Sequence, residues 1–210
     1  MRRARGFTLV ELLVVITIIV VLAGIIFPVA LSMAGKGAET KCMMQLKELA
    51  RGLMIYKSEN KKYPPYSGRQ FVAALYRSSV VNESKLFHCP ASDFVELDGW
   101  EKLAEDALKG KLADPVDEAA TSYAGRRNDP RHKTTLTSDD RNRVPASRIA
   151  VFCDQVWEGP KGPETNHGDR LFVAYLDHHV DMLKVKEDLA GDLRLGEGAT
   201  HEHLKALGVD

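Results

Sequence analysis

The chain has 210 residues, a length that suits one compact domain with one appended element. Its 29 basic and 29 acidic side chains give a formal net charge of zero, so no basic excess indicates nucleic acid as a partner. Hydrophobic residues make up 44% of the chain but gather between Phe7 and Leu31, which leaves the remainder markedly polar. Cys42, Cys89 and Cys153 form no Cys-x-x-Cys pair, and this argues against a structural zinc site or a thioredoxin-like motif.

The N-terminal segment is long and apolar enough to cross a membrane. From Phe7 to Leu31 the only charged side chain is Glu11, and a helix needs about 20 apolar residues to cross a bilayer. Three arginines precede this run, so the positive-inside rule predicts a single pass with the N-terminus in the cytoplasm and the rest of the chain outside. A charged Glu11 costs free energy in lipid, although less near the end of a span than at its centre. We therefore expect Glu11 to have a cationic partner.

The motif Arg5-Gly6-Phe7-Thr8-Leu9-Val10-Glu11, followed by the apolar run, resembles the processing site of type IV prepilins and type II secretion pseudopilins. The resemblance implies that a prepilin peptidase cuts after Gly6 and that the new N-terminal Phe7 is N-methylated. It also implies an assembly role for Glu11 and matches Pro28 to the helix-kinking proline of the family. Cutting would give Phe7 a charged α-amine, which Glu11 of a neighbouring subunit could pair in an apolar contact.

Two other interpretations of the N-terminus stay open. Ser32-Met33-Ala34 could be the cleavage site of an ordinary secretory signal peptide, or the apolar run could be a plain signal anchor. The length of the run and the acid inside it favour the pilin-like interpretation, because the apolar core of a signal peptide is shorter.

After the apolar run, the segment from Ala38 to Lys57 has the period of an amphipathic helix. Apolar residues recur along it at intervals of three and four, at Cys42, Leu46, Leu49, Leu53 and Tyr56. The residues expected on the opposite side are Lys41, Gln45, Glu48 and Gly52. No residue between Pro28 and Lys57 forces a stop, so we predict one helix of about 50 residues that ends before Pro64 and Pro65.

The remainder of the chain has the patterns of short helices followed by strands. We expect helices at 70–77 and 100–112, a long polar surface loop at 114–142, and a short helix at 187–193. Strands are predicted at 148–153, 171–176 and 180–185, with a tight hairpin at Asp177-His178-His179 between the last two. The predicted parts are a leader (1–6), the transmembrane part of the N-terminal helix (7–34), its amphipathic soluble part (35–60) and a globular domain (61–210). The fold class is α+β: a long N-terminal helix, transmembrane in its first half, packed on a C-terminal antiparallel β-sheet.

The C-terminal third is similar to a second pattern. Asn166-His167-Gly168, followed by the predicted strands, resembles the C-terminal signature of large pilin-like proteins of the planctomycete–verrucomicrobial lineage. Phe87-His88-Cys89-Pro90 and Thr121-Ser122-Tyr123 match segments of the same group. The chain departs from that pattern at His178, where glycine is usual, so the type of turn there stays open.

Candidate chemistry is sparse in this sequence. His167, Asp169, Asp177, His178 and His179 could supply metal ligands, but adjacent histidines in a strand point to opposite faces, so a polar hairpin is favoured and no metal is expected. Because no set of residues that would orient a base accompanies the cysteines, no catalytic residue, enzyme activity or cofactor is expected. Outside the cytoplasm disulfides persist, and we predict a Cys89–Cys153 disulfide with Cys42 free.

The resemblance implies a pseudopilin that assembles through its N-terminal helix into a short periplasmic filament of a type II secretion system. Its expected location is the cytoplasmic (inner) membrane, with the C-terminal domain periplasmic or extracellular. Its expected partners are copies of itself or related pseudopilins, the prepilin peptidase, the inner-membrane assembly platform and the lipid bilayer. The alternatives are a type IV pilus subunit for adhesion, motility or DNA uptake, and a membrane-anchored periplasmic binding or hydrolytic domain.

Overall fold

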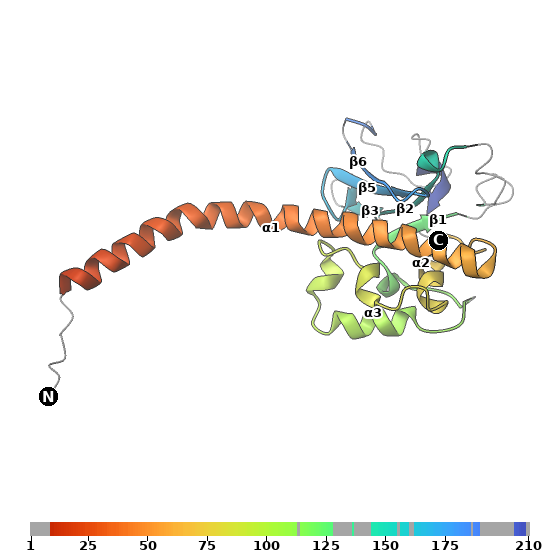
Figure 1. The fold of residues 1–210 in the computed structure, drawn as a ribbon, viewed down its shortest axis with the longest axis horizontal. Helices are drawn as coiled ribbons and strands as arrows, with labels where there is room; N and C mark the ends of the chain where they lie inside the picture. Colours follow the sequence, from red (N-terminus) through yellow and green to blue (C-terminus); the bar gives the residue numbers. More distant parts are fainter. Residues whose placement is uncertain are drawn as a thin grey trace. The chain divides into compact units, whose positions relative to one another are not determined.

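The computed structural model describes residues 9–112, 114–127, 136, 144–154, 156–159, 162–185, 187–189 and 204–208. Gly6 and Phe7, the predicted cleavage and methylation site, lie outside these residues. The chain divides into two units, Met1–Ala38 and Glu39–Asp210. Helix α1, Leu9–Asn60, runs through the boundary as one continuous helix of 52 residues (Figure 1).

The first unit consists of the N-terminal part of α1. Its segment Leu9–Phe27 is long and apolar enough to cross a membrane, and none of that segment is buried in the structure. Glu11 lies in the first turn, where a carboxylate is favoured by the helix dipole. The helix continues without a break at Pro28, and the kink predicted there stays a prediction.

In the second unit, α1 buries the apolar stripe that its periodicity predicts. Cys42, Leu46, Leu49 and Leu53 are fully buried and Tyr56 nearly so, which confirms the amphipathic interpretation of this half of the helix. The placement of Gly52 on the polar side was wrong. A Cβ atom at Gly52 would lie 2.7 Å from Val81 Cγ2, so this glycine lets the chain at Val81 approach the helix closely.

The other helices of the second unit are short. They are α2 (Gly68–Arg77), α3 (Trp100–Leu108), and the 3-10 helices η1 (Ser84–Phe87), η2 (Asp93–Glu96), η3 (Glu118–Ala120), η4 (Ala146–Arg148) and η6 (Leu204–Ala206). The guanidinium group of Arg77, at the end of α2, donates hydrogen bonds to the carbonyl oxygens of Leu108, Lys109 and Asp114. The carbonyls of Leu108 and Lys109 stand at the end of α3, where carbonyls lack partners within the helix, so their bonds to Arg77 tie α2 to α3.

The main sheet has five strands in the order β6-β5-β2-β1-β7, and each neighbouring pair is antiparallel. The strands are β1 (Tyr123–Arg126), β2 (Ala150–Asp154), β5 (Arg170–Tyr175), β6 (Val180–Lys184) and β7 (Leu207–Gly208). A separate hairpin pairs β3 (Val156–Gly159) with β4 (Gly162–Thr165). Strands β2, β5 and β6 confirm the predicted strands, and the antiparallel sheet with its helices confirms the α+β class.

Strand β1 corrects the sequence interpretation. Residues 114–142 were expected to form one surface loop, but Tyr123–Arg126 is an inner strand of the sheet and all four of its residues are buried. A Cβ atom at Gly125 would lie 2.4 Å from the carbonyl oxygen of Gly68, so the start of α2 lies directly on β1. The helix expected at 187–193 is also wrong for its described residues, since 187–189 form a turn and a bend.

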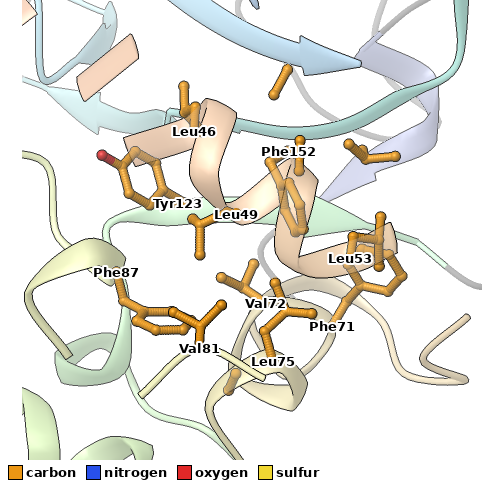
Figure 2. Close-up of a cluster of buried hydrophobic side chains, with 14 of the residues drawn as sticks. Leu46, Leu49, Leu53, Phe71, Val72, Leu75, Val81, Phe87, Tyr123 and Phe152 are labelled. Carbon is orange, nitrogen blue, oxygen red and sulfur yellow. The ribbon is translucent and has the colours of Figure 1, made fainter. Parts of the chain in front are cut away.

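Both faces of the sheet are covered. One face contributes Tyr123, Phe152 and Phe172 to the cluster that contains the buried stripe of α1 together with residues of α2 (Figure 2). The other face contributes Cys153, Leu171, Val173 and Tyr175 to a second cluster with Leu204 and Leu207. Burial on both faces explains why the sequence of β5 is an almost continuous apolar run, without alternation of apolar and polar residues.

Candidate functional site

Four side chains with metal-ligating or acid–base chemistry converge inside the second unit. Cys42 comes from α1, Cys89 from the loop after η1, Asp154 from the end of β2 and His167 from the turn before β5. Their sulfur, nitrogen and carboxylate oxygen atoms all lie within 4.8 Å of one another. The Cys42 thiol donates to Asp154 Oδ1 at 3.0 Å, Cys89 Sγ lies 3.2 Å from His167 Nε2, and His167 Nε2 lies 3.9 Å from Asp154 Oδ2.

Regular backbone structure fixes Cys42 and Asp154. Cys42 begins the buried stripe of α1 and is fully buried. Asp154 follows Cys153 in β2, so its side chain points to the opposite face of the sheet, toward α1. The backbone N–H of Phe172 in the neighbouring strand β5 donates to Asp154 Oδ2 at 3.1 Å. The sheet therefore orients a fully buried carboxylate.

Turns fix Cys89 and His167. The backbone N–H of Cys89 donates to Ser122 Oγ at 3.1 Å, and the N–H of Ala91 donates to Cys89 Sγ at 3.4 Å. The backbone N–H of His167 donates to Thr165 Oγ1 at 3.2 Å, and the imidazole ring packs edge-on against Phe172 with the ring centroids 4.9 Å apart. Both side chains therefore face the cluster from backbone that is itself held by hydrogen bonds.

The groups perturb one another because they share a buried site. Burial raises the pKa of the Cys42 thiol, and burial together with the charge of Cys89 raises the pKa of Asp154 to about 7. The hydrogen bond from Cys42, followed by that from His167, lowers the pKa of Cys89 to about 5 against the effect of burial. Burial opposes the charged form of His167, but Cys89 and Asp154 outweigh it and raise its pKa.

This arrangement does not suit a Cys-His-Asp catalytic triad. In such a triad the acid binds one ring nitrogen of the histidine and the nucleophile the other. Here Cys89 and Asp154 both approach Nε2 of His167. The side chains of Asp154 and His167 are 0% and 2% exposed, and Cys42 and Cys89 are fully buried, so the cluster offers no open surface for a substrate. Four donor atoms around one point are the arrangement of a metal site.

His88 and the Asp177-His178-His179 segment are separate from this cluster. His88 stacks on Phe94 with ring centroids 4.6 Å apart, and burial lowers its pKa to about 4, so it is a neutral core residue. His178 and His179 lie in the turn between β5 and β6, where His179 stacks on Tyr175 and contacts Asp177. The predicted polar hairpin is confirmed for these residues, but His167 points into the core and was wrongly grouped with them.

The predicted Cys89–Cys153 disulfide does not fit the structure. All three cysteines are free and buried. Cys153 belongs to the core on one face of the sheet, whereas Cys89 lies on the other face beside Cys42. Sequence reasoning missed the cluster of four because its residues come from four elements and form no local motif. Glu11 remains the assembly residue of the sequence interpretation, in the first turn of α1.

An apolar N-terminal helix, joined to an α+β domain with an antiparallel sheet, is the architecture of pilin-like proteins. Residues 1–27 match the family described as the prokaryotic N-terminal methylation motif. The N-terminal segment therefore carries the methylation motif that the sequence predicted, and it is similar to the corresponding segment of type IV pilins and pseudopilins.

Curated relatives agree with this class. Type II secretion system core protein G of Klebsiella pneumoniae is 41% identical over 64 residues, which is 30% of this chain and 46% of that protein. The protein of the same name from Pseudomonas aeruginosa is 33% identical over 81 residues, 39% of this chain and 56% of that protein. Type IV wide pilus major component PilA4 of Thermus thermophilus is 36% identical over 63 residues, 30% of this chain and 48% of that protein. The chain spans about half the length of these relatives, and no solved structure gives a significant match.

Proposed function

We propose that this chain is a pseudopilin of a type II secretion system, a filament subunit that assembles through the N-terminal part of α1. The observation that carries the proposal is an acid, Glu11, in the first turn of an exposed apolar helix and within a prepilin-type motif. The similarity to type II secretion core protein G supports the choice of system. In this function the chain is structural and has no enzyme activity.

The proposed mechanism begins with processing. A prepilin peptidase cuts after Gly6, and the α-amine of Phe7, with a reference pKa of about 8, is methylated and keeps its positive charge. Before assembly the segment Leu9–Phe27 lies in the inner membrane with the second unit on the periplasmic side, and an inner-membrane platform extracts it. The apolar side chains of the segment then pack against those of neighbouring subunits, where lipid no longer covers them.

Glu11 sets the register between subunits in this mechanism. A carboxylate and an ammonium group in an apolar contact each cost free energy when alone, and pairing offsets both costs. The pair can form only when one helix is shifted along its neighbour so that Phe7 meets Glu11. The ion pair therefore selects one axial offset, whereas the surrounding apolar packing alone would tolerate several.

A set of variants in the apolar segment tests this proposal. Glu11→Leu should reach the membrane as well as the parent, because it removes a charge that is costly in lipid, and it should still be cleaved after Gly6. Its filament yield in sheared fractions should collapse, whereas Glu11→Asp should be intermediate because the charge remains on a shorter side chain. Thr17→Val is the matched control: it also removes a polar group from the segment, one that donates to the Leu13 carbonyl of its own helix, and it should assemble normally.

Three results would oppose the proposal. Normal filament yield from Glu11→Leu would show that Glu11 sets no register. Equal loss from Thr17→Val would show that any change in the segment blocks assembly. A mature N-terminus other than methylated Phe7, determined by intact-mass and peptide mass spectrometry, would remove the basis for the mechanism.

A type IV pilus subunit is the second candidate, and the similarity to the Thermus thermophilus pilus component favours it. Both candidates share the processing and the Glu11 mechanism. Electron microscopy of cells that express the chain with its own assembly genes separates them, because a pseudopilin forms short periplasmic filaments and a pilin forms long surface fibres.

A further inference from the structure

We propose that Cys42, Cys89, Asp154 and His167 bind one structural zinc ion that fastens α1 to the sheet and to the loop after η1. All four residues belong to the second unit, so the inference stands independently of how the N-terminal segment assembles. It differs from the sequence expectation, which argued against a structural zinc site because the cysteines form no Cys-x-x-Cys pair.

The spacing of the donor atoms suits tetrahedral zinc. Bond lengths of about 2.0–2.3 Å to nitrogen, oxygen and sulfur place the ligands of a tetrahedral site ~3.3–3.8 Å apart. The separations in the structure are 3.0 Å for Cys42 Sγ to Asp154 Oδ1, 3.2 Å for Cys89 Sγ to His167 Nε2 and 3.9 Å for His167 Nε2 to Asp154 Oδ2. All four donor atoms lie within 4.8 Å of one another, so shifts of about 1 Å or less would bring them to tetrahedral spacing.

The kinds of donor atom select the metal. Calcium and magnesium take oxygen ligands, in shells of six or more, and two sulfurs with one nitrogen exclude them. Tetrahedral sites of cysteine and histidine are typical of zinc, and a carboxylate can complete them. All four positions are filled by protein side chains with no open face, which is the arrangement of a structural rather than a catalytic zinc site.

Hydrogen bonds from neighbouring groups hold the proposed ligands in place. The N–H of Phe172 donates to Asp154 Oδ2, and the N–H of Ala91 donates to Cys89 Sγ. The hydroxyl of Tyr123 lies 3.5 Å from Cys42 Sγ and donates to Gln45 Oε1 at 2.8 Å. Hydrogen bonds of this kind orient metal ligands and stabilise their anionic forms.

Zinc explains the buried carboxylate better than a disulfide does. A Cys42–Cys89 disulfide would use the two thiols but would leave Asp154, which is 0% exposed, with one backbone N–H and the imidazole nitrogen at 3.9 Å. A carboxylate in such a position costs several kcal/mol unless a cation compensates it. A zinc ion compensates two thiolates and the carboxylate together, and His167 binds it as a neutral ligand through Nε2.

Metal analysis of the full chain in detergent tests the proposal. Purified parent protein should contain one zinc ion per chain by elemental analysis and by native mass spectrometry. Cys42→Ser and Cys89→Ser should each lose it. Cys153→Ser is the matched control, because this cysteine is also buried and directly precedes Asp154, but it faces the other core. It should retain the zinc of the parent.

A second measurement uses the parent protein alone, so it tests the proposal even if the variants fail to fold. Parent protein prepared with a chelator should unfold at a temperature lower by about 10 °C or more, and Zn²⁺ alone should restore it, since structural zinc contributes directly to folding free energy. Co²⁺ added to the same protein should give the visible absorption of a tetrahedral cobalt–thiolate centre. Any of three results overturns the proposal. The first is a parent protein that contains no zinc and whose mass is two hydrogens below that of the reduced chain, which would indicate a disulfide. The others are a Cys89→Ser variant with as much zinc as the parent, and an unfolding temperature that Zn²⁺ does not change.

Discussion

Leu49→Ala offers a direct test of how α1 is held in the second unit. Leu49 is fully buried, with 0% of its surface exposed to solvent. Figure 2 shows it among the labelled side chains of α2, β1 and the segment around Phe87. Truncation of a buried leucine removes its apolar burial and leaves a cavity, at a cost of about 2–5 kcal/mol. Since neighbours on three elements surround the site and α1 is a continuous helix, we expect little collapse and a loss of about 3 kcal/mol.

The measurement is thermal unfolding of the full chain in detergent, followed by near-ultraviolet circular dichroism. For a domain of about 150–250 residues, a loss of 3 kcal/mol lowers Tm by roughly 6–12 °C. Met44→Ala is the control, because it shortens another apolar side chain of the same helix that is 66% exposed, and a change there should stay within about 0.5 kcal/mol. Equal Tm values for the two variants would refute the packing of α1 on this core.

The remaining predictions concern backbone positions of the second unit. His178 has φ 71° in the turn after β5, a conformation that favours glycine, so His178→Gly should raise the free energy of unfolding by about 0.5–1 kcal/mol. His179→Gly should lower it, because this change removes the ring stacked on Tyr175. Tm shifts of the same sign in the two variants would contradict this prediction. Gly125→Ala should cost about 1–3 kcal/mol, because its Cβ atom would lie 2.4 Å from the Gly68 carbonyl oxygen, and unchanged urea unfolding would oppose it.

Much of the fold could be predicted from local pattern. The apolar stripe of α1 and strands β2, β5 and β6 follow from periodicity and from apolar runs, which tertiary contacts only reinforce. Strand β1 could not be found in this way. Its sequence, Tyr-Ala-Gly-Arg, contains residues that are unfavourable in strands and lies in a polar region. Its burial comes from partners distant in sequence, β2 on one side and β7 on the other.

The candidate site was predictable only in part. The prepilin-type motif is contiguous, so sequence alone indicated Gly6, Phe7 and Glu11. The buried cluster is assembled by tertiary structure, and each of its members has an ordinary local explanation. His167 was grouped with His178 and His179 because they are close in sequence, but the whole of β5 separates them, and the turn at Thr165 directs His167 inward. The spacing rule for cysteines detects zinc sites within one loop and not those formed between elements.

Strand β6 has one further consequence for assembly. It is the edge of the main sheet, and its exposed charged side chains are already paired within the chain, Lys184 with Glu187 and Asp181 with His179. An edge strand that carries charged side chains discourages pairing with the strand of another molecule. In the proposed filament, crowding of many copies would therefore not draw the β6 edge into strand pairing between molecules, and growth through helix contacts would leave this edge as it is.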